Sequence, residues 1–298
     1  MNQLLAMRAF VRVVETESFS RAADQLGIPR STVSKLVTDL EAHLRVKLIH
    51  RTTRTVAATT DGLAYLVHAR RIVNDVDSVD NALSGNTLKP HGHLRIDAPA
   101  SFATSLLIPA LPDFHRQYPD ITVAIGISDR TLNVLGEGVD CAIRAGQLDD
   151  LSLVARQVSA LPFVTCAAPD YLATHGIPED PEQLAEGHRL VAYFFPASGK
   201  LEGLAFQQGE QSHTFSTAAF TTNEGNGLTA LLLAGMGIGQ HLKAVLQPHL
   251  DSGKLVEILP GWTKPALPLH AVYPPNRNQS ARLMVFVEWL QRTFGQGT

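Results

Sequence analysis

The stretch SFSRAADQLGIPRSTVSKLVTDLE, residues 18–41, constrains the fold most, because it places two short amphipathic segments on either side of Gly-Ile-Pro. Gly27 suits the left-handed position that ends many helices. Pro29 suits the start of the next helix, where its backbone angle is already helical and its missing N–H would have no partner. The spacing therefore predicts a helix over residues 21–26, a tight turn and a further helix from Pro29.

The second of these helices has an apolar stripe and a polar face. Its stripe consists of Val33, Leu36, Val37 and Leu40 at helical spacing. Small polar and cationic residues lie off this stripe near the helix start: Arg30, Ser31, Thr32, Ser34 and Lys35. A helix with such a face fits the major groove of DNA, which is roughly 12 Å wide. The pattern favours DNA reading, and an ordinary helical hairpin with solvated polar residues is the alternative.

Residues flanking this pair complete a small basic region. Residues 4–15 have helical periodicity, and residues 52–60 are rich in β-branched and small side chains, which favours a short hairpin or wing. Arg51 and Arg54 in the wing are candidate contacts to DNA phosphates, which position a protein without reading sequence. Residues 1–60 hold nine Lys and Arg against five Asp and Glu.

The rest of the chain has a different character. Residues 91–298 hold thirteen Lys and Arg against nineteen Asp and Glu, so only the front of the chain suits a polyanion. A length of 298 residues predicts two or three domains. With no apolar run near the roughly 20 residues of a membrane span and no signal-peptide cleavage site, we expect a cytoplasmic protein without membrane contact. Cys141 and Cys166 lack metal or redox spacing and are expected to be buried free thiols.

A long helix is predicted over residues 62–83, capped by Thr60-Asp61. Apolar residues recur along it at three and four spacing, at Leu66, Ala69, Val73, Val76 and Leu83. This seam favours a dimerising coiled coil, and a linker helix packed on the body is the alternative. Residues 84–93 combine Ser, Gly and Pro with polar residues and mark a domain boundary.

Strands and helices alternate after this boundary. HLRIDAP, ITVAIGIS and DCAIRAG are strand-like, with helical segments between them at 105–119 and 129–138, and this succession predicts parallel sheets covered on both faces. A second set begins near Val164. We therefore expect two α/β lobes, with the chain crossing near Leu161 and again near Leu267.

Several stretches of the chain resemble those of a known family. AFVRVVETESFSRAADQLGIPRSTVSKLVTDLEAHL, followed by HRTTRTVAATTDG, is similar to the winged helix-turn-helix of the LysR-type transcriptional regulators, and HGHLRIDAP, GVDCAIRAG, LLAGMGIG and PLHAVYPPNR fit the layout of their effector domain. Two residues depart from the family pattern: Pro29 stands where a capping serine is frequent, and Arg45 where a glycine commonly ends the third helix.

The resemblance implies an α+β multidomain fold. It divides the chain into a winged helix-turn-helix domain, 1–60, a linker or dimerisation helix and hinge, 61–90, and a two-lobed α/β effector domain of the periplasmic-binding-protein type, 91–298. Lobe I is expected over 91–161 and 268–298, and lobe II over 162–267. The function implied is a sequence-specific transcription regulator controlled by a small-molecule effector.

The same resemblance makes Arg30, Ser31, Thr32, Ser34 and Lys35 the DNA readers and Arg51 and Arg54 the wing contacts. Arg30 is the preferred base reader, because a guanidinium pairs well with guanine O6 and N7. The effector site is expected between the lobes, at residues that follow strands and precede helices or end a strand: Ser101, Phe102, Ser128, Arg144, Thr222 and Asn223.

Helix starts favour carboxylates, so an organic anion is the first candidate effector, although Asp129 and Glu224 would oppose it if both faced inward. Arg144 could equally form a structural ion pair with a nearby acid. The family layout further implies promoter DNA as partner, a dimer that assembles into a tetramer, and RNA polymerase as a possible contact. No metal and no cofactor are predicted.

An α/β enzyme with an accessory helical domain is the alternative function. GMGIGQ, residues 235–240, fails as a dinucleotide fingerprint because Gln240 replaces its last glycine and the glycines follow a helix. The chain contains no GxSxG and no HExxH. A purely architectural DNA-binding protein is disfavoured by some 200 non-basic residues. We therefore predict a regulator and not an enzyme.

Overall fold

The computed structural model describes residues 1–51, 56–83, 90–130, 138–146, 148, 152–275 and 280–295; between residues 74 and 83 it describes only the side chain of Val76. The chain divides into two compact units, the first built mainly from residues 1–83 and the second mainly from residue 90 onward. No helix within the described ranges is long and apolar enough to cross a bilayer.

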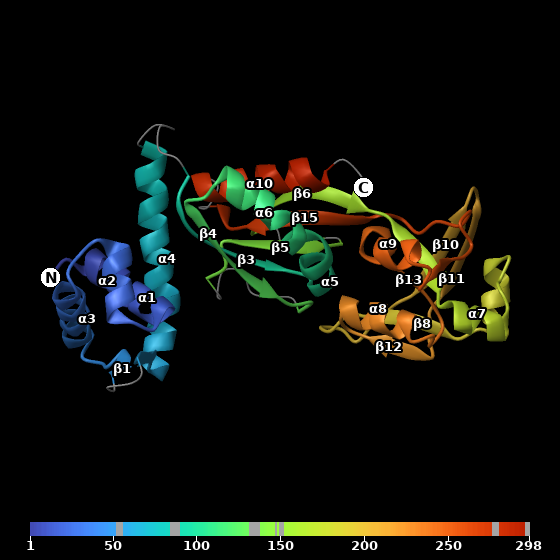
Figure 1. Cartoon of the computed structure of the whole chain (residues 1–298), viewed down its shortest axis with the longest axis horizontal. Helices are drawn as coiled ribbons and strands as arrows, with labels where there is room; N and C mark the ends of the chain where they lie inside the picture. Colours follow the sequence, from blue (N-terminus) through green and yellow to red (C-terminus); the bar gives the residue numbers. More distant parts are fainter. Residues whose placement is uncertain are drawn as a thin grey trace. The chain divides into compact units, whose positions relative to one another are not determined.

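The first unit contains helices and a two-stranded antiparallel wing (Figure 1). Its elements are α1 (Gln3–Thr16), α2 (Phe19–Leu26), α3 (Arg30–Leu44), β1 (Ile49–Arg51), β2 (Val56–Ala58) and α4 (Thr60–Leu83). Phe10, Val33, Val37 and Leu40 are fully buried at the centre, so the predicted stripe of α3 faces the core. The helix–turn–helix and the wing are confirmed.

Both turns around α3 use the left-handed conformation. Gly27 ends α2 with a φ of 64°, and Arg45 ends α3 with a φ of 57°, although Arg45 carries a side chain. The Arg45 N–H bonds the carbonyl groups of Ala42 and Glu41, so the turn that commonly uses glycine is preserved with arginine. Pro29 lies at the position immediately before α3 and not in its first turn, and Ser18 caps α2, which begins at Phe19, two residues earlier than predicted.

Glu41 connects α3 to the wing. Its carboxylate accepts hydrogen bonds from the backbone N–H groups of Leu48 (3.0 Å) and Ile49 (3.1 Å) and from Lys47 Nζ (2.8 Å). Burial alone raises the pKa of Glu41, but the bonds from Lys47, Ile49 and Leu48 outweigh it and hold the pKa below the ordinary value of 4.5. The buried charge thereby fixes the start of β1 against the end of α3.

The start of α4 differs from the prediction. Thr59 caps the helix, since its Oγ1 accepts the N–H of Gly62 at 2.8 Å, and Thr60-Asp61 already belong to the first turn. A side chain at residue 62 would overlap the carbonyl oxygen of Leu48, so glycine permits this close approach. Leu66, Ala69 and Val73 of the predicted seam are buried with the core of the first unit. These three residues therefore pack within the chain and are not available to a coiled-coil partner.

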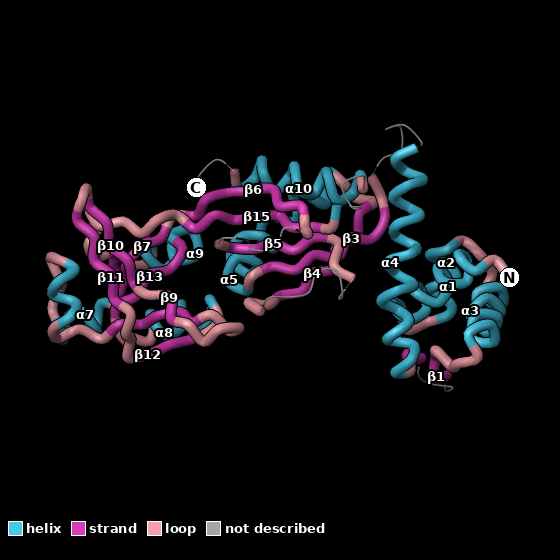
Figure 2. Tube along the Cα trace, turned by 180° about the vertical axis from the view of Figure 1, so that it is seen from behind, coloured by secondary structure: helices cyan, strands magenta, loops and turns pink. Residues whose placement is uncertain are grey.

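The second unit contains two lobes, each built on a sheet with helices (Figures 1 and 2). Lobe I contains β3 (Gly92–Ala98), α5 (Ala100–Phe102), η1 (Ala103–Leu107), α6 (Ile108–Gln117), β4 (Ile121–Ile127), β5 (Cys141–Ala145), β6 (Val154–Leu161), β15 (Leu267–Tyr273) and α10 (Ala281–Phe294). Its five strands follow the order β4-β3-β5-β15-β6. The predicted helix 129–138 lies largely outside the described residues.

Lobe II contains β7 (Phe163–Ala167), α7 (Pro169–His175), η2 (Pro181–Ala185), β8 (Leu190–Phe194), β9 (Leu201–Glu202), β10 (Leu204–Gln208), β11 (Gln211–Phe215), β12 (Phe220–Thr222), α8 (Gly225–Leu233), β13 (Ile238–Leu242), α9 (Lys243–Asp251) and β14 (Val256–Glu257). Its main sheet follows the order β12-β8-β13-β7-β14, with β9 beside β8, while β10 and β11 form a separate hairpin.

The expectation of purely parallel sheets is wrong. β3 pairs in parallel with β4 and β5, but β15 is antiparallel to both β5 and β6, and β7 is antiparallel to β13. The reason is the double crossing between lobes: β6 leads into β7, and β15 returns the chain beside β6. Strands that carry the chain out and back must run in opposite directions, whereas strands joined by helices remain parallel.

Prediction for Glu41. Glu41→Gln keeps the size of the side chain and one oxygen that can still accept from Leu48 and Ile49. It removes the charge and replaces the oxygen that accepts from Lys47 by an NH2 donor. We expect the first unit to lose about 1–3 kcal/mol of stability at pH 7. The contribution of a carboxylate with a lowered folded-state pKa is present above its unfolded value and is lost as pH falls through the folded value. The difference between variant and wild type should therefore shrink below about pH 4.

Hydrogen exchange of peptides covering residues 41–51 measures this loss within the first unit. Asp24→Asn on α2 is the control, because Asp24 is exposed and we expect its replacement to leave exchange unchanged. Equal protection in wild type and Glu41→Gln at pH 7 would contradict the role of Glu41.

Candidate functional site

The polar start of α3 is open to solvent. Arg30, Ser31, Thr32 and Lys35 are exposed and Ser34 is half-buried, while the apolar stripe on the opposite side is covered. No side chain among the described residues caps this helix, since Pro29 precedes it. Backbone N–H groups at an uncapped helix start carry partial positive charge and suit a phosphate. The five predicted readers therefore share one uncovered surface.

Arg51 has a second role that the sequence did not predict. Its Nη1 donates to Ser34 Oγ at 3.0 Å, its Nη2 lies 3.4 Å from Thr38 Oγ1, and its guanidinium lies 4.4 Å from the centre of the Phe19 ring. Arg51 thus ties the wing to the polar face of α3, and Thr38 joins the site. Arg54, the other predicted wing contact, lies outside the described residues.

A cavity of about 470 Å³ lies between the two lobes of the second unit. Both crossing strands and the ends of strands in each lobe contribute to it. It is lined by Pro99, Ser101, Phe102, Ser128, Asp129, Arg130, Arg144, Ala145, Gly146, Phe163, Tyr193, Phe195, Pro196, Ala197, Glu202, Gly225, Leu228, Gln240, His241, Leu242, Leu267 and Leu269. This volume is within the range of small-molecule sites, and the walls are predominantly apolar and aromatic.

Asp129 joins the two lobes inside this cavity. Its Oδ1 accepts the N–H of Ala100 at 2.7 Å, where α5 begins in lobe I, and its Oδ2 accepts the N–H of Gly225 at 2.9 Å, where α8 begins in lobe II. The starts of α5 and α8 also approach each other closely at this point. A Cβ atom on Gly225 would lie 2.7 Å from the Cβ atom of Ser101, closer than such atoms approach. One carboxylate therefore satisfies a donor from each lobe.

The other charged side chains around the cavity are largely paired. Arg144 Nη1 lies 2.9 Å from Asp97 Oδ1, and Asp97 is only 2% exposed, so the structural ion pair left open by the sequence is present. Glu202 pairs with Lys264 at 3.0 Å, and Lys264 Nζ also lies 4.0 Å from the centre of the Phe163 ring. Within the described chain these pairs neutralise charge that a ligand would otherwise meet.

Two lining residues keep buried polar atoms that have no hydrogen-bond partner in the described part of the chain. These atoms are Arg144 Nη2 and His241 Nε2. Burial lowers the pKa of His241 to about 4; a backbone hydrogen bond with Gly225 opposes this shift and the charge of Lys264 adds to it. The imidazole is therefore neutral at pH 7. Such unsatisfied buried groups are rare in folded proteins and suit a ligand that supplies the missing partners.

The structure brings together four of the six predicted effector residues. Ser101, Phe102, Ser128 and Arg144 line the cavity. Thr222 and Asn223 do not: the Thr222 hydroxyl hydrogen-bonds the backbone of Glu224, whose carboxylate caps α8. Both were chosen because they end a strand, and the sequence does not show which way the chain turns into α8.

Several lining residues were missed, including Tyr193, Glu202, Gln240 and His241. The one usable signal was the polar Gln-His pair inside the apolar stretch GIGQHL. Gln240 itself is satisfied, since it bonds Thr165 and both the N–H and the carbonyl of Ala205, and it holds the β10–β11 hairpin to β13. Phe195 lines the cavity, whereas its neighbour Phe194 does not.

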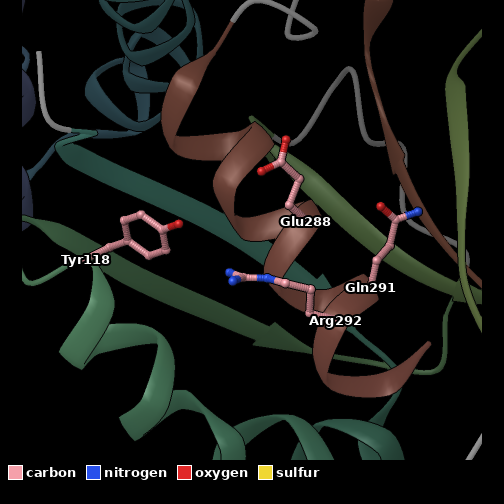
Figure 3. Close-up of a pocket in the computed structure, with 4 residues that line it drawn as sticks. All are labelled: Tyr118, Glu288, Gln291 and Arg292. Atoms are coloured by element: carbon pink, nitrogen blue, oxygen red, sulfur yellow. The ribbon is translucent and has the colours of Figure 1, made fainter. Parts of the chain in front are cut away.

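A second hollow of about 610 Å³ lies in lobe I and differs in chemistry (Figure 3). It is lined by Tyr118, Glu288, Gln291 and Arg292, and the last three project from α10. Arg292 Nη2 donates to Gln117 Oε1 at 3.2 Å. Three of its four lining side chains are polar or charged, whereas the cavity between the lobes has a predominantly apolar lining, which is typical of a ligand site.

The two cysteines take no part in either site. Cys141 and Cys166 are free and buried, as predicted. Burial, reinforced by Asp140 for Cys141 and by Glu257 for Cys166, raises the pKa of both thiols to about 12. Neither thiol is therefore ionised at neutral pH, which makes both poor nucleophiles.

A helix with an uncovered polar start, joined in one chain to a two-lobed domain with a ligand-sized cavity, defines a ligand-responsive helix-turn-helix regulator. Residues 4–63 match the family described as bacterial regulatory helix-turn-helix protein, lysR family, and residues 88–295 match the LysR substrate binding domain. The chain belongs to the LysR family of bacterial transcriptional regulators. It is therefore a DNA-binding transcriptional regulator and not an enzyme.

Its relatives include both a transcriptional repressor and a transcriptional activator. An HTH-type transcriptional repressor of Pseudomonas aeruginosa is 36% identical over 304 residues, covering 99% of this chain and 93% of that protein. The HTH-type transcriptional activator AaeR of Escherichia coli is 31% identical over 294 residues, covering 99% and 94%. The structure of CrgA, a LysR-type regulator from Neisseria meningitidis, is similar with a TM-score of 0.63 at 34% identity, covering 98% of this chain and 99% of that one.

Prediction for Gly225. Gly225→Ala places a methyl group against Ser101 at the contact between the lobes, so we expect a loss of about 1–3 kcal/mol of stability and a lower melting temperature. Ser101→Gly in the same chain removes the opposing atoms and should restore most of the loss. Thermal unfolding of wild type, both single variants and the double variant measures the coupling. Additive effects of the two substitutions would show that the helix starts do not meet there.

Proposed function

We propose that α3 reads an operator in the major groove and that a small molecule in the cavity between the lobes controls this binding. The uncovered polar start of α3 is the single observation that carries the proposal, because a helical hairpin with a purely structural role does not need it. Arg30, Ser31, Thr32, Ser34 and Lys35 are the proposed readers of bases and phosphates. Arg51 and Arg54 are the proposed wing contacts to the DNA backbone.

A dimer follows from this proposal. Two recognition helices spaced by about one turn of DNA, roughly 34 Å, would read an interrupted palindrome. α4 is the proposed dimer element, but it must use side chains other than Leu66, Ala69 and Val73, which pack inside the first unit. Leu63, 56% exposed, and Ile72, 39% exposed, are apolar residues of α4 outside that packed stripe. They stand nine residues apart, so they lie on opposite sides of the helix and one partner helix would cover only one of them.

The ligand is proposed to act through the angle between the lobes. A ligand shifts such an equilibrium only by its difference in affinity for the two arrangements. Pairs of dimers joined through their effector domains would convert that shift into a change in the spacing of the DNA-binding helices. We place this tetramer in the cytoplasm, with RNA polymerase as its further partner at the promoter.

Electrophoretic mobility shift with the promoter beside the gene's own reading frame tests the proposed function. We expect a shifted complex that survives an excess of random duplex. Binding that random competitor abolishes as readily as unlabelled promoter would overturn the proposal.

Prediction for the DNA interface. Arg30→Ala should relax sequence preference by about 1–3 kcal/mol at one operator position, because it removes a base contact. Arg51→Ala should weaken binding to all sequences and reduce the slope of log affinity against log salt by about one, because it removes a phosphate contact. Footprinting and salt titration distinguish the two effects.

Arg51→Lys adds a test of the second role of Arg51. Lysine keeps the charge but cannot bridge Ser34 and Thr38, so a loss of affinity with an unchanged salt slope would identify the bridge as the positioning element. Arg116→Ala in the second unit is the control, since Arg116 is exposed and pairs with Asp113. A salt slope that changes for Arg30→Ala and stays constant for Arg51→Ala would reverse the assignment.

A further inference from the structure

The position in the cavity that best suits a carboxylate is already filled by the chain. The N–H groups of Ala100 and Gly225 converge from opposite lobes on Asp129, with distances of 2.7 and 2.9 Å. α8 runs for nine residues behind Gly225, and α5 continues through η1 into α6 behind Ala100. Both helix starts therefore direct partial positive charge at Asp129, and the start of α8 also holds the carboxylate of Glu224 on the N–H groups of Asn226 and Gly227. A ligand carboxylate at this point would meet a like charge and donors that are already occupied.

The other charged side chains around the cavity attract an anion only weakly. The positive charge of Arg144 is held by the buried Asp97, and Glu202 is paired with Lys264. Arg130 lines the cavity but is exposed, so its attraction for an anion is screened by water. Burial and the carboxylates of Asp129, Glu202 and Glu224 raise the pKa of Tyr193, which indicates negative potential around its hydroxyl group.

The hydrogen-bonding positions that stay open have a specific character. Arg144 Nη2 can only donate, so it needs an oxygen acceptor on the ligand. His241, 6% exposed, is neutral at pH 7 and leaves Nε2 without a partner in the described part of the chain. The same cavity is lined by four aromatic residues: Phe102, Phe163, Tyr193 and Phe195. This lining suits a flat apolar body that carries hydrogen-bonding groups and no charge.

We infer that Asp129 is a resident anion that fills the carboxylate position of the cavity, and that the cavity therefore selects an uncharged ring compound whose polar groups pair with Arg144 and His241. The inference rests on the proposed role of this cavity as the effector site. It replaces the organic anion that the helix starts suggested, because those helix starts already have their carboxylate. It also assigns Asp129 as the residue that determines ligand charge.

Benzamide and benzoate form a matched pair of probes. They share ring and shape, but benzamide is neutral and offers both an acceptor for Arg144 and a donor for a histidine nitrogen, whereas benzoate is charged and has no donor. At pH 7.5 we expect the wild-type chain to bind benzamide at least roughly tenfold more tightly than benzoate, as measured by calorimetry. Equal binding of the two, tighter binding of benzoate, or binding of neither by wild type would overturn the ligand class.

Asp129→Ala should reverse this preference. The variant leaves the N–H groups of Ala100 and Gly225 unpaired around an empty space, so benzoate should gain roughly tenfold in affinity. Acetate at constant ionic strength, compared with chloride, should raise the melting temperature of Asp129→Ala and leave wild type unchanged. No gain for benzoate and no effect specific to acetate would overturn the role of Asp129.

Asp129→Asn and Asp180→Ala complete the design. Asparagine keeps the shape of the side chain and one acceptor oxygen, so Asp129→Asn replaces Asp129→Ala if circular dichroism shows that the alanine variant does not fold. The affinity for benzoate should rise in Asp129→Asn too, by a smaller factor. Asp180 accepts a backbone N–H from Glu182 at 2.8 Å outside the cavity, so Asp180→Ala should show no acetate effect. All these readouts are independent of DNA, so failure of the mobility shift would reject the proposed function alone.

Discussion

Backbone N–H groups at the starts of helices and strands need acceptors, and in both units of this chain a buried or half-buried carboxylate supplies them beside the proposed site. Glu41 accepts the first N–H groups of the wing at Leu48 and Ile49. Asp129 accepts one N–H from each lobe at Ala100 and Gly225. Leaving a buried N–H group unpaired costs more free energy than its hydrogen bond contributes to stability. Each carboxylate therefore holds its donors in place more strongly than the net stabilisation from its hydrogen bonds suggests.

These contacts decide which surfaces can move and which cannot. Glu41 fixes β1 to the end of α3 and Arg51 fixes it to the polar face of α3, so the wing and α3 form one continuous surface, the proposed DNA-reading surface. The lobes also meet at the helix starts, where Asp129 is joined by the close approach of Gly225 to Ser101 and by a bond of 3.2 Å from Thr104 to Asn226.

The sequence predicted what local pattern determines. The turn at Gly27, the stripe of α3 and the alternating elements of the second unit depend on residues close together in the chain. Contacts between residues distant in sequence could not be predicted. Nothing in the sequence indicates that Asp129 meets Gly225, or that Leu66 packs in the core of the first unit and not against a partner helix. The mixed sheets share this cause, because they depend on how the chain returns between the lobes. The absence of Thr222 and Asn223 from the cavity lining depends instead on the local turn into α8.

A resident carboxylate has a consequence for the direction of the switch. An anionic ligand would have to displace Asp129 and would leave that carboxylate without its two donors, so binding would favour separated helix starts. An uncharged ligand leaves both bonds in place and adds contacts to Arg144 and His241, which belong to different lobes. It therefore stabilises the arrangement in which the helix starts meet. If Asp129 has the proposed role, ligand charge would determine which arrangement of the lobes binding favours, since only a difference in affinity shifts such an equilibrium.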